Sequence, residues 1–82
     1  MIAREIKRLA EAHTPSELEA AADAIAEGEE LPFDVVGEDE GEKVTNLLLA
    51  SRIAAKVAAG EAPKTAFRSV MGDVRDLLKN ES

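Results

Sequence analysis

The chain is 82 residues long, and its 45% hydrophobic and 33% charged residues are typical of one small globular domain, not of a disordered or membrane protein. The absence of cysteine excludes disulfides, thiolate metal sites and cysteine nucleophiles. The formal net charge of −7 argues against general nucleic-acid binding, because attraction to phosphates needs a basic face.

The first predicted helix covers about residues 2–13. Ile2, Ile6 and Leu9 fall on one stripe of this helix, opposite its basic residues. His13 ends the helix, and we expect it to be a helix-end residue suited to the negative dipole end or a packed, hydrogen-bonded histidine. The N-terminus lacks the apolar core of a signal peptide, and no apolar run approaches the ~20 residues of a membrane span. The cytoplasm is therefore the expected location.

A capping box opens the second predicted helix, at about residues 15–27. Thr14 supplies the hydroxyl N-cap, Pro15 occupies the first helical position, and Glu17 occupies the third. This combination predicts a sharp turn between the first two helices. Gly28 suits the position just after the helix end, where glycine is preferred.

The next segment, about residues 28–39, is expected to be an extended acidic connection. Residues 27–42 contain eight acids and no base, whereas the remainder contains ten bases and nine acids. Leu31, Phe33 and Val35 alternate with other residue types, which is an extended pattern. We expect these side chains to hold the connection against the core. The alternative is a short edge strand that pairs with another chain.

The third predicted helix, about residues 40–59, is followed by Gly60 and is the most apolar of the four. Its apolar positions span roughly 240° of the circumference, against a usual arc somewhat above ~100°. We expect this helix to be central and covered on most sides, by the rest of the chain or by a second copy. Asn46 lies inside the arc, where it either makes satisfied internal hydrogen bonds or sets the register of an interface. The narrow polar strip consists of Thr45, Arg52 and Lys56.

The fourth predicted helix covers about residues 63–79, with Pro63 near its first position. Its apolar face is expected to comprise Phe67, Val70, Met71, Val74, Leu77 and Leu78. A basic stripe runs beside this face and comprises Lys64, Arg68, Arg75 and Lys79. The stripe is either a solvated face that offsets the acidic connection or a docking surface for the acidic loop of another copy. Helix-turn-helix contact with DNA is a further alternative.

No pattern in the sequence indicates catalysis. A helix–loop–helix calcium site needs an oxygen ligand at the first loop position, where Val36 stands if Gly41 is the loop glycine. His13 is the only histidine, and Ala10 stands where a Glu-x-x-His metal pair needs its glutamate. No serine and histidine form a recognisable triad. We therefore expect no enzymatic activity, no cofactor and no metal.

Several short motifs follow one another along the chain. They are Ile6-Lys-Arg-Leu9, His13-Thr-Pro-Ser-Glu-Leu-Glu19, Phe33-Asp-Val-Val-Gly37, Thr45-Asn46, Ala58-Ala-Gly60, and Lys64-Thr-Ala-Phe67 followed by Val70. With these motifs in this order, the sequence resembles, over most of its length, a family of short, acidic bacterial proteins catalogued as a domain of unknown function. The motifs are caps and core positions, so the resemblance implies no activity, ligand or catalytic residue.

These observations predict an all-α fold, a single domain over residues 1–82 with four helices in a small orthogonal or bundle-like arrangement around a central third helix. The expected function is a non-catalytic protein-interaction module that self-associates, preferably as a dimer, or binds another protein, but not nucleic acid or a membrane. The alternatives are a small-molecule or ion-binding module, with a pocket near His13, Asn46 or Arg52, and a DNA-binding protein. The predicted interaction residues are Leu31, Phe33, Val35, Asn46, Leu47, Arg52, Arg68 and Arg75.

Overall fold

The computed structural model describes the backbone of residues 1–80 and the side chains of residues 1–75. It contains the helices α1 (Ala3–Ala12), α2 (Pro15–Ala26), α3 (Glu40–Ala58) and α4 (Pro63–Asn80), and no strand in the described residues. The predicted all-α fold is therefore confirmed, and each helix boundary lies within one residue of its predicted range. The connection contains no strand in the described residues, and the alternative of an edge strand that pairs with another chain stays a prediction.

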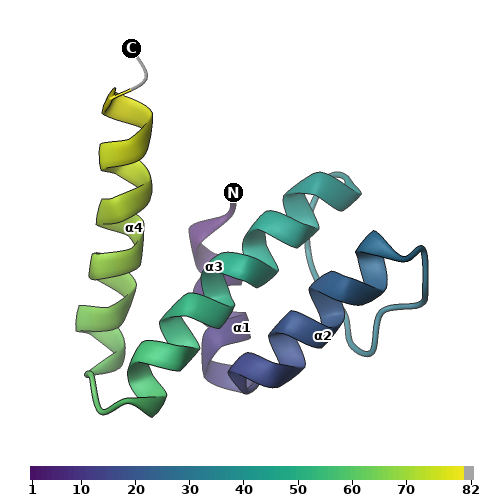
Figure 1. Cartoon of the computed structure of the whole chain (residues 1–82), viewed down its shortest axis with the longest axis horizontal. Coiled ribbons are helices and arrows are strands. Elements are labelled where there is room, and N and C mark those ends of the chain that lie inside the picture. The colour runs from purple at the N-terminus through teal and green to yellow at the C-terminus, as the bar shows by residue number, and fades with distance from the viewer. Residues whose placement is uncertain (81–82) are drawn as a thin grey trace.

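Helix α3 is the centre of the molecule, as predicted. It packs against α1, α2 and α4, whereas α4 packs extensively only against α3. Figure 1 shows α1 behind α3, α2 alongside it, and α4 crossing near its C-terminal end, with the far half of α4 extending away from the other helices. The fold is flat, with principal extents of 34 × 32 × 18 Å.

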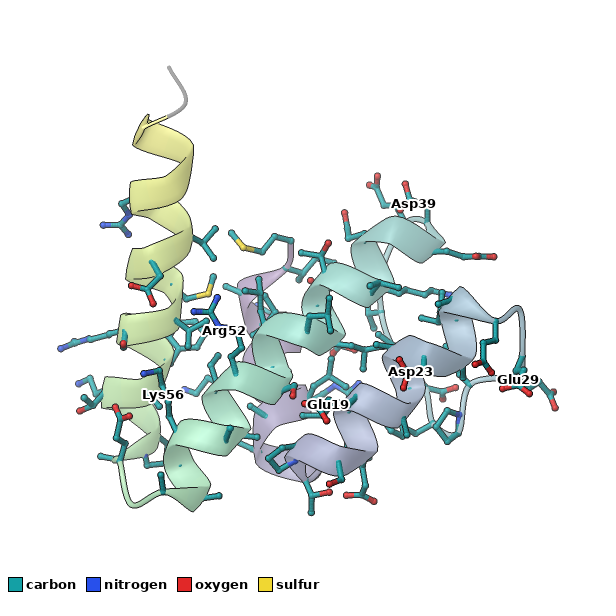
Figure 2. The ribbon with its side chains drawn as sticks, in the orientation of Figure 1. Glu19, Asp23, Glu29, Asp39, Arg52 and Lys56 are labelled. Carbon is teal, nitrogen blue, oxygen red and sulfur yellow. The ribbon has the colours of Figure 1, made fainter. Side chains whose placement is uncertain are left out.

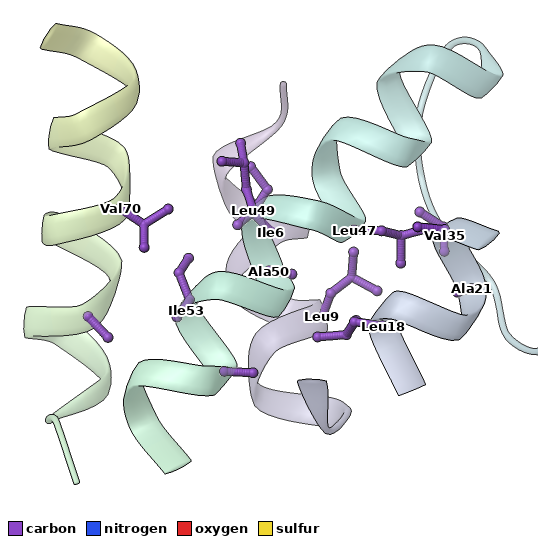
Figure 3. Packing of buried hydrophobic residues seen from close by; sticks show 13 residues of the cluster. Ile6, Leu9, Leu18, Ala21, Val35, Leu47, Leu49, Ala50, Ile53 and Val70 are labelled. Atoms are coloured by element: carbon purple, nitrogen blue, oxygen red, sulfur yellow. The ribbon is translucent and has the colours of Figure 1, made fainter. Parts of the chain in front are cut away.

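The core is a thin layer of aliphatic and alanine side chains around α3, shown in Figure 3. Its largest fully buried apolar members are Ile6 and Leu9 from α1, Leu18 from α2, Leu47 from α3 and Val70 from α4. Burying a side chain of this size stabilises the fold by about 1.5–3 kcal/mol relative to leaving it exposed. Both phenylalanines are half-buried at the edge of this layer. The core is accordingly small, as the composition indicates.

Part of the apolar surface of α3 is not covered by the chain itself. Leu48 is 48% exposed, while Ser51 is buried. The three neighbouring helices cover three sides of α3, and the remaining side faces solvent. That side carries Thr45, Leu48, Arg52 and Ala55, which follow each other at helical spacing.

The helix ends agree with the local signals in the sequence. The Thr14 hydroxyl accepts a hydrogen bond from the Glu17 backbone N–H, and the Glu17 carboxylate accepts one from the Thr14 N–H. Gly28 and Gly60 follow α2 and α3 with φ of +73° and +108°, a left-handed region that favours glycine. Both ends form Schellman motifs, such as the bonds from Gly28 N to Ile25 O and from Glu29 N to Ala24 O. These local signals explain why the boundaries were predictable.

Helix α4 presents Ala66 and Val70 to the core, with Phe67, Met71 and Val74 partly buried beside them. This part of the predicted apolar face is therefore confirmed. The side chains of Leu77, Leu78 and Lys79 lie outside the described residues.

Candidate functional site

The structure separates the predicted interaction residues into two groups. Val35, Asn46 and Leu47 are buried, and Leu31 and Phe33 are half-buried against the core. These five residues hold the monomer together, with the apolar side chains of the connection packed on the core as expected. The second group is exposed and consists of Arg52, Arg68 and Arg75.

Asn46 makes satisfied internal hydrogen bonds. Its side chain is fully buried, and its Oδ1 accepts a hydrogen bond from the backbone N of Ile2 at 3.0 Å. Its Nδ2 donates to the backbone oxygen of Val36 at 2.9 Å. The amide therefore joins α3 to the N-terminus and to the acidic connection, which accounts for a polar residue in the apolar arc.

A second buried polar group, Glu5, was not identified from the sequence. This carboxylate is 4% exposed and accepts hydrogen bonds from Arg8 at 2.6 and 2.7 Å and from the backbone N of Val36 at 2.7 Å. Arg8 also donates to the backbone oxygen of Asp34 at 3.1 Å. The bond from Arg8, followed by that from Val36, lowers the pKa of Glu5 against the opposing effect of burial. The i, i+3 spacing of Glu5 and Arg8 indicates an ion pair on one helix face. It does not indicate that this pair contacts the acidic connection.

His13 is half-buried at the C-terminal end of α1, where its ring stacks on Phe33. The ring centroids are 3.7 Å apart and the planes are 14° from parallel. The expected helix-end position and packing are confirmed. His13 thus contributes to holding the connection against the core.

Arg52 links α3 to α4 at the surface. Its guanidinium lies 3.4 Å from the Asp73 carboxylate, and both side chains are more than half exposed. An exposed pair of this kind adds little stability, because solvent screens it. Arg52 therefore orients α4 weakly.

A groove of about 860 Å³ lies between α1, the C-terminal half of α3 and the N-terminal half of α4. Its apolar lining consists of Ala10, Ile53, Val57, Pro63 and Phe67. Its charged lining consists of three bases and one acid, namely Lys7, Lys64, Arg68 and Glu11. The helix-four stripe was predicted, but its meeting with α1 was not, because that contact joins distant parts of the chain.

The groove continues along α4. A second hollow of about 390 Å³ shares Phe67 and Arg68 with the first and extends past Met71, Gly72 and Arg75. Arg68 and Arg75 are thereby brought to one strip of surface. We call the two hollows together the α4 groove. None of His13, Asn46 or Arg52 lines it.

The opposite part of the molecule is strongly acidic. Residues 14–42, which form α2, the connection and the first turn of α3, contain eleven of the seventeen acids and none of the ten bases. Figure 2 shows Glu19, Asp23, Glu29 and Asp39 on this side, away from α4. We call this part the acidic end. The charge asymmetry is wider than the predicted acidic connection, because α2 is included.

Neither a metal site nor a membrane span emerges from the described part of the chain. No group of three or more acidic or histidine side chains there is placed to hold a metal ion. No helix in residues 1–80 is long and apolar enough to cross a membrane.

Comparison with protein-family models gives a match over nearly the whole chain. The model of a family of unknown function, DUF6952, matches residues 1–79. No curated protein and no solved structure matches the chain.

Proposed function

We propose that this chain, which belongs to the family of unknown function DUF6952, is a non-catalytic protein-interaction module that self-associates, with a dimer as the favoured assembly. The observation that supports the proposal best is the α4 groove, an apolar surface with a charged rim on a helix that packs extensively only against α3. The cytoplasm stays the predicted location.

The apolar side chains of the α4 groove are incompletely covered. Val57, Phe67 and Met71 are only partly buried, although each packs against the core. Apolar surface surrounded by polar residues is typical of protein–protein interaction sites. A partner on this surface would bury a phenylalanine and a methionine, two residue types enriched in interfaces.

The alternative of a small-molecule site is less well supported. Ligand pockets combine apolar walls with a few polar groups that converge on the ligand. Here the charged groups that line the groove, such as Lys64 and Arg68, are on exposed residues. Among the described residues, every buried side-chain nitrogen and oxygen already has a hydrogen-bond partner. No buried polar group therefore awaits a ligand.

Light scattering behind a sizing column tests the proposal, at several protein concentrations and at low and high salt. We expect a mass of at least twice the 8.7 kDa of one chain at high protein concentration. Phe67→Gln should lower this mass, because it replaces apolar surface in the groove. Leu48→Gln is the matched control, since Leu48 is 48% exposed and lies outside the groove.

Folding is checked by circular dichroism on each variant, and Met71→Gln replaces Phe67→Gln if the latter is unfolded. A mass of 8.7 kDa at every concentration and salt would overturn self-association. Equal loss of mass in Leu48→Gln and Phe67→Gln would overturn the assignment to the groove.

A further inference from the structure

Resting on the proposed self-association, we infer that the α4 groove of one copy binds the acidic end of a second copy, so that copies associate head to tail. The contacting acids would be those at the C-terminal end of α2 and just beyond it, Asp23, Glu27, Glu29 and Glu30. The contacting bases would be Lys7, Lys64, Arg68 and Arg75.

Charge complementarity supports this occupant over the alternatives. The charged side chains that line the groove are mostly basic, and the acidic end contains no base at all. A symmetric pairing of two α4 helices would place Arg68 and Arg75 near their own counterparts, which repel. The net charge of −7 also opposes association in most orientations. An orientation that joins a groove to an acidic end brings opposite charges together.

The acids at the end of α2 are placed unfavourably for the isolated helix. A helix C-terminus has a partial negative charge, which basic residues usually complement. The last turn of α2 contains no base, and Asp23, Glu27, Glu29 and Glu30 all lie at or beyond this end. Each of these residues is exposed. Cations from a second copy would compensate a charge arrangement that the monomer leaves unbalanced.

The two surfaces lie at opposite ends of the flat molecule. Figure 1 shows α4 at one end and the connection after α2 at the other, with α3 between them. One copy therefore cannot fill its own groove with its own acidic end. The groove and the acidic end are different surfaces, so a single contact between them is heterologous, whereas two reciprocal contacts about a twofold axis would close an isologous dimer.

Paired charge reversals test the inference. Lys64→Glu with Arg68→Glu reverses the groove, and Glu27→Lys with Glu30→Lys reverses the acidic end. We expect each double variant alone to associate at least about tenfold more weakly than the parent, because like charges then meet. An equimolar mixture of the two should regain a complex, since the reversed surfaces are complementary. Masses come from light scattering, and Kd values come from sedimentation equilibrium.

These reversals are compatible with folding. All four positions are exposed, and the changes place an acid in the first turn of α4 and a base at the end of α2, where helix dipoles favour them. Weaker association would therefore not reflect unfolding, and circular dichroism checks this. The single variants Arg68→Glu and Arg4→Glu are compared as a control, since both change the net charge equally and Arg4 is exposed but does not line the groove.

The acid reversal separates specific contact from general repulsion. It changes the net charge from −7 to −3, which weakens the general repulsion between copies. If only this repulsion governed association, the variant would associate more strongly than the parent. Stronger association of this variant would overturn the inference, as would the absence of a complex in the mixture. If the parent oligomer survives every reversal but is lost in Phe67→Gln, self-association stands and the head-to-tail contact is wrong. If the parent is a monomer throughout, the proposed function itself fails.

Discussion

Glu5 is the acidic residue whose side chain contributes most directly to holding the fold together. Its carboxylate is buried, yet three hydrogen bonds from Arg8 and Val36 satisfy it. Because the backbone of Val36 also receives a bond from Asn46, two buried side chains hold the same point of the connection. The acidic connection is therefore attached to the helices by polar contacts as well as by Phe33 and Val35.

Replacing Glu5 with glutamine should destabilise the monomer at neutral pH. Hydrogen bonds to a charged group are worth about 1.5–3 kcal/mol, and the neutral amide cannot reproduce the bonds from Arg8 and Val36 together. We expect a loss of that size in the free energy of unfolding, measured by urea denaturation. Glu11→Gln is the control on the same helix, where an exposed side chain should change stability by less than about 0.5 kcal/mol.

The same variant has a predicted pH dependence. The pKa of Glu5 is lower in the folded protein than its ordinary value of 4.5, so its contribution is complete above that value. It is lost as the pH falls through the lowered folded pKa. The stabilities of the parent and Glu5→Gln should therefore converge in acid and separate above the ordinary pKa. A difference that is constant across this range would contradict the assignment.

At the scale of whole elements, the sequence was sufficient wherever the deciding signal is local. The proline and capping box at Thr14 and the glycines after α2 and α3 determine their own positions. The exposed side of α3 was not predictable, because periodicity shows how apolar a helix is but not which neighbours cover it. Leu48 illustrates this limit, since only the positions of the other helices leave it in solvent.

Gly37 illustrates a contact between elements that periodicity cannot reveal. A Cβ at this position would lie 2.8 Å from the Cγ of Lys43 and 3.0 Å from its backbone nitrogen. The Lys43 side chain can move, but the first turn of α3 cannot move without disturbing its cap. Gly37→Ala should therefore lower the free energy of unfolding by about 1–3 kcal/mol, the usual cost of overpacking.

The matched control for Gly37→Ala is Gly72→Ala, within α4. A Cβ there meets no atom within 4 Å, and alanine is a better helix former than glycine by about 0.5–1 kcal/mol. Thermal and urea denaturation of monomeric samples should show the two substitutions moving stability in opposite directions. Equal shifts would mean that the close approach of the connection to α3 is not maintained in solution.

For the whole molecule, the sequence predicted that there is an acidic surface and a basic surface, but not which helices come together to form each of them. The acidic connection and the basic stripe of α4 were both predicted. The structure adds α2 to the acidic surface, and it adds α1 to the groove beside the basic stripe. Five predicted interaction residues instead support the monomer. An apolar alternation such as Leu31 to Val35 has the same pattern whether it covers its own core or that of a partner. Only the three-dimensional arrangement distinguishes the two.

If copies associate as proposed, the thin core makes the stability of the fold depend on that association. A domain of this size buries a limited fraction of its surface, and oligomerisation commonly supplements such cores. If head-to-tail contacts form only between folded copies, they stabilise the folded state by mass action. The melting temperature of the parent should then rise with protein concentration.

The expected size of this rise follows from linkage. A binding partner, here a second copy, at a concentration about a hundredfold above Kd raises the free energy of unfolding by about 2.7 kcal/mol. Each kcal/mol raises Tm by about 4–8 °C in a domain of this size. We expect an increase in Tm of about 10–20 °C across that concentration range, measured by calorimetry. The Lys64→Glu, Arg68→Glu variant should show a clearly smaller rise over the same concentrations, because its folded copies bind one another more weakly. A concentration dependence equal to that of the parent would show that the stabilising contact lies outside the α4 groove.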